Sequence, residues 1–219
     1  MIKAVLFDMD GTLLDTETIG LKAWQYVIDK YHIGIDLTLP IKSIGLNYKS
    51  MTELFYKELG SDFPFEKYWK EGTEYLKNYE QTNGIPVKKG FDELSEFLKE
   101  NKIKTIVATS TYHNSAIEKL RRVGIYEKFD GLVGGDEIDN GKPAPDIFLK
   151  AAMLSGFSAD ECIVVEDSEN GVKAALSAGI RCIYIKDIKD IDKKIKAGIF
   201  RECKDLSEIR EVIKELNFS

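Results

Sequence analysis

Residues 2–12 read IKAVLFDMDGT, an apolar run that ends in two aspartates separated by one residue. The run over residues 2–7 is almost wholly apolar, which is typical of a strand in a parallel sheet covered on both faces. In an open α/β sheet, ligands bind beyond the carboxyl ends of the strands. We therefore expect Asp8 and Asp10 at such an edge, where Gly11 lets the chain turn sharply.

Three more segments carry polar groups suited to a shared site. Thr109 with Ser110, and Glu166 with Asp167, each follow a further apolar run, and Lys142 lies in a loop that the next residue, a proline, stiffens. Because the carboxyl ends of parallel strands share one edge of a sheet, we expect these groups to converge on the two aspartates.

The remaining pattern predicts an α/β fold built on a doubly wound parallel sheet, since strands alternate with helices. Strands are expected at 104–108, 131–133, 162–165 and 181–185, and helices at 91–101, 114–123, 146–154, 170–178 and 206–216. Residues 16–83 instead show apolar and aromatic residues at helical spacing. The predicted organisation is an α/β domain over 1–15 and 84–219 with a helical insert over 16–83.

Composition excludes several classes of function. The net charge is −6 and no basic block stands out, so nucleic acid is not expected as a partner. No apolar stretch approaches the length of a membrane span, and we expect no signal peptide before the first strand. Cys162 and Cys182 lie in apolar runs and are expected to be buried thiols, which favours a cytoplasmic setting. With two histidines in the chain, a zinc site is not expected.

The paired carboxylates indicate phosphoryl chemistry with a cation. Asp8 and Asp10 face the same way in an extended chain, about 6 to 7 Å apart. Glu166 and Asp167 add an acidic cluster that would repel itself without a cation, and oxygen ligands suit Mg²⁺. Each pair also has a plainer interpretation, a polar turn for the first and an acidic helix N-terminus for the second. We expect Glu166 to be more structural than Asp167.

Lys142, Thr109 and Ser110 suit a phosphate group. A lysine supplies a point charge for a phosphate oxygen, and a hydroxyl with free N–H groups near a helix start forms an anion site. Taken singly, Lys142 would be read as a surface lysine and the hydroxyl residues as a helix cap. The four segments in this order favour phosphate.

With these motifs in place, the sequence resembles the haloacid dehalogenase superfamily, in the subgroup whose helical cap is inserted after the first strand. The matching segments are 8–13, 109–110, 141–146 and 165–168. The resemblance implies a Rossmann-like core and a form similar to β-phosphoglucomutase and to sugar-phosphate phosphatases. It also implies that residues 16–83 are the cap, which closes over the site and excludes water.

The resemblance further implies roles for the site residues. Asp8 is the expected nucleophile, which forms an aspartyl-phosphate, and Asp10 is the expected general acid and then general base. Thr109 and the Ser110 N–H are expected to hold the phosphoryl group, while Lys142 balances its charge. The expected ligands of Mg²⁺ are the Asp8 and Asp167 carboxylates and the Asp10 backbone carbonyl, with Glu166 beside them.

The sequence restricts the identity of the substrate less closely than it restricts the reaction. β-Phosphoglucomutases that resemble this chain carry a histidine near Gly20 and an arginine near Tyr48, and this chain has neither. The prediction is therefore a Mg²⁺-dependent phosphatase of small phosphorylated metabolites, foremost sugar phosphates, with a phosphomutase as the alternative. Tyr48 and Lys49, in a predicted loop, and Thr16, at the hinge, are the expected substrate contacts from the cap.

One rival belongs to a different class. Non-catalytic phospho-receiver domains also place an aspartate at a strand end in a doubly wound fold, with Mg²⁺ and a lysine. The chain length, the helical insert and Asp10 fit that class poorly. We expect the protein to act as a monomer.

Overall fold

The computed structural model describes residues 1–218, which divide into two compact units. The α/β unit comprises residues 1–15 and 86–218, and the helical unit comprises residues 16–85. The second junction therefore falls after Ile85, where the sequence had suggested residue 83.

The α/β unit contains a six-stranded sheet in the order β3-β2-β1-β4-β5-β6, with every neighbouring pair parallel. This confirms the predicted fold class. The strands are β1 (Ala4–Phe7), β2 (Lys104–Ala108), β3 (Gly131–Val133), β4 (Cys162–Glu166), β5 (Arg181–Ile185) and β6 (Arg201–Cys203). The last of these was not predicted, because two of its three residues are exposed and charged.

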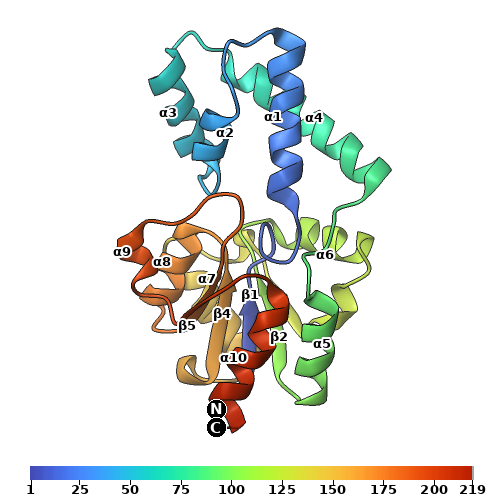
Figure 1. The fold of residues 1–219 in the computed structure, drawn as a ribbon, viewed down its shortest axis with the longest axis vertical. Helices are drawn as coiled ribbons and strands as arrows, with labels where there is room; N and C mark the ends of the chain where they lie inside the picture. Colours follow the sequence, from blue (N-terminus) through green and yellow to red (C-terminus); the bar gives the residue numbers. More distant parts are fainter. Residues whose placement is uncertain (219) are drawn as a thin grey trace. The chain divides into compact units, whose positions relative to one another are not determined.

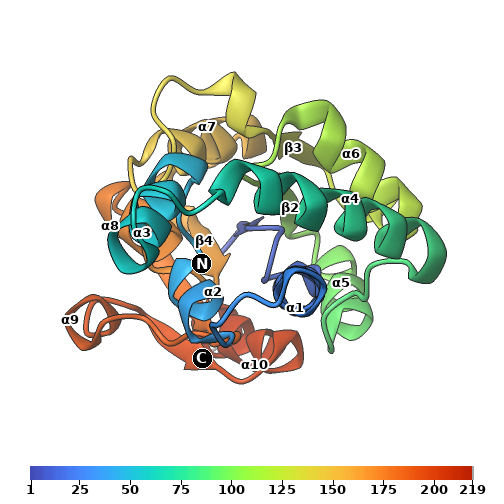
Figure 2. The same ribbon diagram turned by 90° about the horizontal axis from the view of Figure 1, so that it is seen from above.

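Helices cover both faces of the sheet, as Figures 1 and 2 show. Helices α7 and α8 pack on one face, and α5 and α10 pack together on the other. The α-helices of this unit are α5 (Phe91–Glu100), α6 (His113–Arg122), α7 (Asp146–Ser155), α8 (Glu169–Ser177), α9 (Lys193–Lys196) and α10 (Leu206–Phe218). Short 3₁₀ turns lie at Tyr126–Lys128, Gly135–Glu137 and Ala159–Glu161.

Strand β1 is the centre of the sheet, and its side chains alternate between the two faces. Ala4 and Leu6 join the buried cluster beneath α7 and α8. The Phe7 ring meets Phe129 at a centroid distance of 6.2 Å, and Phe129 in turn meets Phe91 of α5 at 5.8 Å. Burying a large apolar side chain contributes about 1.5–3 kcal/mol, so β1 is held firmly on both faces.

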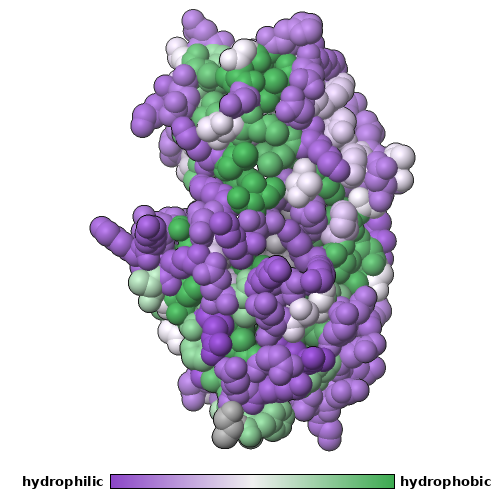
Figure 3. Space-filling model, viewed as in Figure 1, coloured by the Kyte–Doolittle hydropathy of each residue, from purple (hydrophilic) through white to green (hydrophobic). Residues whose placement is uncertain are grey.

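The helical unit consists of α1 (Thr16–Tyr31), α2 (Thr38–Ser43), α3 (Tyr48–Leu59) and α4 (Phe65–Asn83). Its buried centre is aromatic: Trp24 stacks on Phe55 at 4.7 Å, and Phe65 lies 5.1 Å from Phe55. Figure 3 shows apolar residues gathered on this unit, whereas the face of the α/β unit in the same view is largely hydrophilic.

Further observations concern single residues of the two units and the character of the helices. Tyr26 is 37% exposed and its ring stacks on that of Tyr75, while the Tyr31 ring lies tilted against that of Tyr68 at a centroid distance of 4.9 Å. The cysteines are free and buried, which confirms the prediction for Cys162 and Cys182. Among the helices of residues 1–218, none has the length and apolar character needed to cross a bilayer.

Candidate active site

The site is built where the strand order changes direction, at β1 between β2 and β4. Phe7 pairs in register with Val107 on one side and Val165 on the other. Asp8 continues this alignment, because its N–H donates to the Val165 carbonyl at 3.0 Å. The register therefore brings the residues that follow three strands to one edge of the sheet, as the sequence predicted.

Lys142 joins two of the carboxylates at this edge. Its Nζ contacts Asp8 Oδ1 and lies 2.7 Å from Glu166 Oε1. The three side chains are at most 10% exposed, and the Lys142 ammonium also lies over the Phe148 ring at 4.9 Å. Buried charges are tolerated when they are paired and hydrogen-bonded, so Lys142 is a constituent of the site and not a surface lysine.

Two glycines make room for the carboxylates. Gly11 has φ +87°, and a Cβ added there would lie 2.3 Å from an Asp167 carboxylate oxygen. A Cβ at Gly171 would lie 1.6 Å from Glu166 Oε1. The two positions therefore need glycine for close packing, and at Gly11 also for the left-handed backbone.

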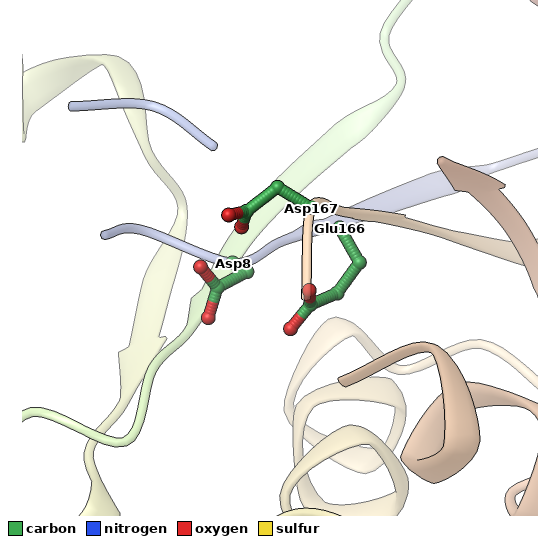
Figure 4. A group of neighbouring side chains, drawn as sticks. All are labelled: Asp8, Glu166 and Asp167. Atoms are coloured by element: carbon green, nitrogen blue, oxygen red, sulfur yellow. The ribbon is translucent and has the colours of Figure 1, made fainter. Parts of the chain in front are cut away.

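Asp8, Glu166 and Asp167 form a compact acidic cluster, shown in Figure 4. Each offers an oxygen, and these oxygens lie within 4.8 Å of one another. The Thr12 hydroxyl donates to Asp167 Oδ1 at 2.7 Å, while the second Glu166 oxygen accepts from the Ser168 N–H at 2.6 Å. With both of its oxygens engaged, Glu166 is suited to positioning Lys142.

The donor set fits a divalent cation that prefers oxygen. Asp8 and Glu166 both contact the Lys142 ammonium, and Asp167 adds a third buried carboxylate, one oxygen of which lies within 4.8 Å of theirs. Desolvation by burial is the main cause that raises the pKa of Asp8, from 3.8 to about 8, against the opposing charge of Lys142 and with a further rise from Glu166. A cation at this cluster would favour the ionised form of Asp8.

The Asp10 carboxylate is bound by two other side chains. Its Oδ2 accepts from the Thr111 hydroxyl at 2.7 Å, and its Oδ1 lies 3.0 Å from Lys119 Nζ. Both partners were missed in the sequence. Thr111 lies one residue beyond the Thr109 and Ser110 pair, and Lys119 lies inside α6, where no pattern distinguishes it from a surface lysine.

Thr109 and Ser110 follow β2 before α6 begins. The Thr109 side chain is buried, and its hydroxyl accepts from the Thr111 N–H at 3.1 Å. Ser110 is exposed. Neither caps α6 with a side-chain bond; the first N–H of that helix, from His113, donates instead to Asp136 at 2.6 Å.

The residues expected to contact substrate from residues 16–83 lie in helices. Tyr48 and Lys49 were placed in a loop, and this was wrong: they open α3, because Asn47 caps that helix by accepting from the Ser50 N–H at 2.9 Å. Tyr48 packs against Phe65 and Trp69, and Lys49 is exposed. Thr16 begins α1, and its hydroxyl is buried without a hydrogen-bond partner within residues 1–218.

The helical unit contains a hollow that is partly open to solvent, about 700 Å³ with open solvent included. It lies between α1, α2 and α4, and its walls are mainly apolar. Both tryptophans of the chain line it, and a Cβ built at Gly20, another lining residue, would meet no heavy atom within 4 Å.

Comparisons with known proteins agree with this geometry. A sequence model of haloacid dehalogenase-like hydrolases matches residues 2–179. A phosphorylated carbohydrates phosphatase of Thermotoga maritima is 33% identical over 98% of this chain and all of its own length. A beta-phosphoglucomutase of Bacillus subtilis is 30% identical over 84% of this chain and 83% of its own. The crystal structure of CbbY from Rhodobacter sphaeroides in complex with phosphate has a TM-score of 0.73 and 26% identity, covering 95% of this chain and 96% of that one.

Proposed function

Because this chain belongs to the haloacid dehalogenase-like hydrolases, we propose that it is a Mg²⁺-dependent phosphatase of small phosphorylated metabolites that works through an aspartyl-phosphate. The observation that carries the proposal is the buried contact of Lys142 with both Asp8 and Glu166, beside Asp167. Phosphoryl transfer through an aspartate uses a carboxylate nucleophile and an oxygen-bound cation, and this buried cluster offers carboxylates for both roles.

In the first step, an Asp8 oxygen attacks phosphorus and the bond from phosphorus to the ester oxygen breaks. Asp10 delivers a proton to the departing oxygen, so that an alcohol leaves and not an alkoxide. The Thr109 hydroxyl and the Ser110 N–H bind the phosphoryl oxygens. Lys142 holds Asp8 in place for attack and offsets the charge on the phosphoryl group.

In the second step, water attacks the phosphorus of the aspartyl-phosphate. Asp10, now ionised, takes a proton from that water, and the bond from Asp8 to phosphorus breaks. Inorganic phosphate leaves, and both aspartates return to their starting states. Dividing hydrolysis into two displacements replaces one very slow reaction by two faster ones.

The cation would be held by the Asp8 and Asp167 carboxylates and the Asp10 backbone carbonyl. Bound there, Mg²⁺ supplies positive charge against the phosphoryl oxygens. The Thr12 hydroxyl fixes the orientation of Asp167, and Lys142 fixes that of Asp8. Such support of metal ligands by neighbouring hydrogen bonds is common in metal sites.

The substrate class we favour is sugar phosphates. The phosphatase of Thermotoga maritima, similar over the full length of both chains, acts on phosphorylated carbohydrates by its name. A mutase reaction is less well supported, because position 20 carries no side chain and Tyr48, near which such mutases carry an arginine, is an exposed ring that contacts Phe65 and Trp69.

The proposal is tested by assaying the purified protein with Mg²⁺ against a panel of phosphate monoesters and measuring released inorganic phosphate. The panel includes p-nitrophenyl phosphate and β-glucose 1-phosphate, and formation of glucose 6-phosphate from the latter is measured in parallel. We expect phosphate release that EDTA abolishes. Absence of turnover for the whole panel would reject the phosphatase and favour a receiver-type protein; glucose 6-phosphate without phosphate release would favour the mutase.

A further inference from the structure

Asp10 is held by two side chains that no motif pointed to. The Thr111 hydroxyl donates to Asp10 Oδ2 at 2.7 Å, and the Lys119 ammonium donates to Asp10 Oδ1 at 3.0 Å. The partners are 101 and 109 residues away along the chain, and they come from the segment after β2 and from α6. Both oxygens of the Asp10 carboxylate are thus engaged.

Thr111 is itself fixed at three points. Besides its bond to Asp10, its N–H donates to the Thr109 hydroxyl at 3.1 Å, and its carbonyl accepts from the Gly135 N–H at 2.9 Å. Thr111 therefore connects Asp10 to Thr109, the hydroxyl residue proposed above to bind the phosphoryl group. A chain of hydrogen bonds of this kind fixes the relative placement of the groups that it joins.

The backbone of Asp10 is also constrained. The Leu13 and Leu14 N–H groups both donate to the Met9 carbonyl, at 2.9 and 3.0 Å, and the Gly11 N–H donates to the Leu14 carbonyl at 2.8 Å. With the turn fixed in this way, the remaining freedom of Asp10 is rotation of its own side chain. That rotation is what Thr111 and Lys119 restrict.

We propose that Lys119 and Thr111 are positioning residues for the reaction, which hold the Asp10 carboxylate where it exchanges a proton with the ester oxygen and then with water. The inference rests on the proposed function. A misplaced catalytic group costs far more in rate than in stability. The Lys119 and Asp10 side chains are 26% and 27% exposed, and pairs as exposed as this add little to folding stability.

The test compares two esters that differ in their need for a proton. p-Nitrophenolate leaves without protonation, whereas phenolate is more basic and benefits from a general acid. We expect Lys119→Met to lower kcat/KM for phenyl phosphate about tenfold and for p-nitrophenyl phosphate about twofold or less. Thr111→Val should have the same selectivity. Lys119→Arg, which keeps a donor of the same charge, should recover most of the loss.

Lys3→Met is the matched control, because it removes another lysine–carboxylate pair, with Glu161, just before β1. It should leave both esters unaffected. An equal loss for the two esters in Lys119→Met, or no loss for either, would overturn the positioning role. The proposed function fails separately, if wild type lacks Mg²⁺-dependent turnover or Asp8→Asn retains it.

Discussion

The two units of this protein bury different kinds of side chain. In the α/β unit, Asp8, Glu166 and Lys142 are buried against one another at the edge of the sheet. In the helical unit, the buried groups are mainly apolar, and aromatic rings such as Trp24 and Phe55 form the centre. Burying charge is costly unless partners are well placed, whereas burying rings stabilises directly. The buried side chains of the α/β site must therefore keep their charges and their hydrogen-bond partners. Those of the helical unit need mainly to fit together in shape.

The largest effect should follow from removing the nucleophile. Asp8→Asn keeps the size of the side chain but cannot form the aspartyl-phosphate, so we expect loss of activity by about 10⁴-fold or more. The measurement is phosphate release from p-nitrophenyl phosphate under saturating Mg²⁺. Activity within tenfold of wild type would exclude Asp8 as the nucleophile.

The next effect should follow from removing Lys142, the ammonium group of the same cluster. Lys142→Met leaves Asp8 and Glu166 buried without their shared partner, and breaking a buried pair costs about 3–5 kcal/mol. We expect this loss in urea unfolding, together with loss of activity. Lys142→Arg should restore neither the stability nor the activity, because a guanidinium is wider than an ammonium. Lys89→Met, at an exposed pair with Asp205, is the control and should unfold as wild type does.

The third prediction concerns pH in the absence of metal. Burial raises the pKa of Asp8 from 3.8 to about 8, with Glu166 adding to the rise and Lys142 opposing it, so the protonated form is favoured on folding. A raised pKa contributes stability that is full below about pH 4 and lost as pH rises through about 8. The metal-free protein should therefore lose up to about 1.4 kcal/mol per pH unit between pH 5 and 8.

Thermal unfolding in EDTA at pH 5, 6, 7 and 8 measures this loss, which corresponds to about 2–4 °C in Tm for each kcal/mol. Mg²⁺ should raise Tm most at pH 8, where binding ionised Asp8 removes the penalty. Asp8→Asn lacks the titrating group, so its Tm should change less across this range. A Tm that rises from pH 5 to 8 in the metal-free wild type would contradict the assigned direction.

The fold was largely predictable because strands buried on both faces must be apolar runs. β1, β2, β4 and β5 all satisfy this requirement. β6 escaped detection, since an edge strand of three residues with Arg201 and Glu202 exposed has no such pattern. The loop expected at Tyr48 and Lys49 is instead the start of α3, which Asn47 caps.

The site was predictable where residues directly follow strands, since topology alone brings Asp8, Thr109 and Asp167 to one edge. The contact of Lys142 with Glu166 was not predictable, because it depends on the path of an irregular segment between β3 and α7. The contact of Lys119 with Asp10 was still less predictable from the sequence. The two residues lie 109 positions apart, and nothing in the sequence of α6 indicates the contact.

The smallest predicted effect tests the helical unit, where shape should matter and charge should not. Gly20 lies in α1 with open space at its Cβ position, so Gly20→Ala should stabilise the protein by about 0.5–1 kcal/mol through helix propensity. Gly60→Ala is the matched contrast, with equal space but φ +93°, and should destabilise the protein.

The leucine side chain in Gly20→Leu should enter the hollow of the helical unit and shift tryptophan emission, because both tryptophans line that hollow. Unchanged emission in a folded Gly20→Leu protein would show that the hollow does not receive this side chain, and the contrast drawn between the two units would lose its support on the helical side.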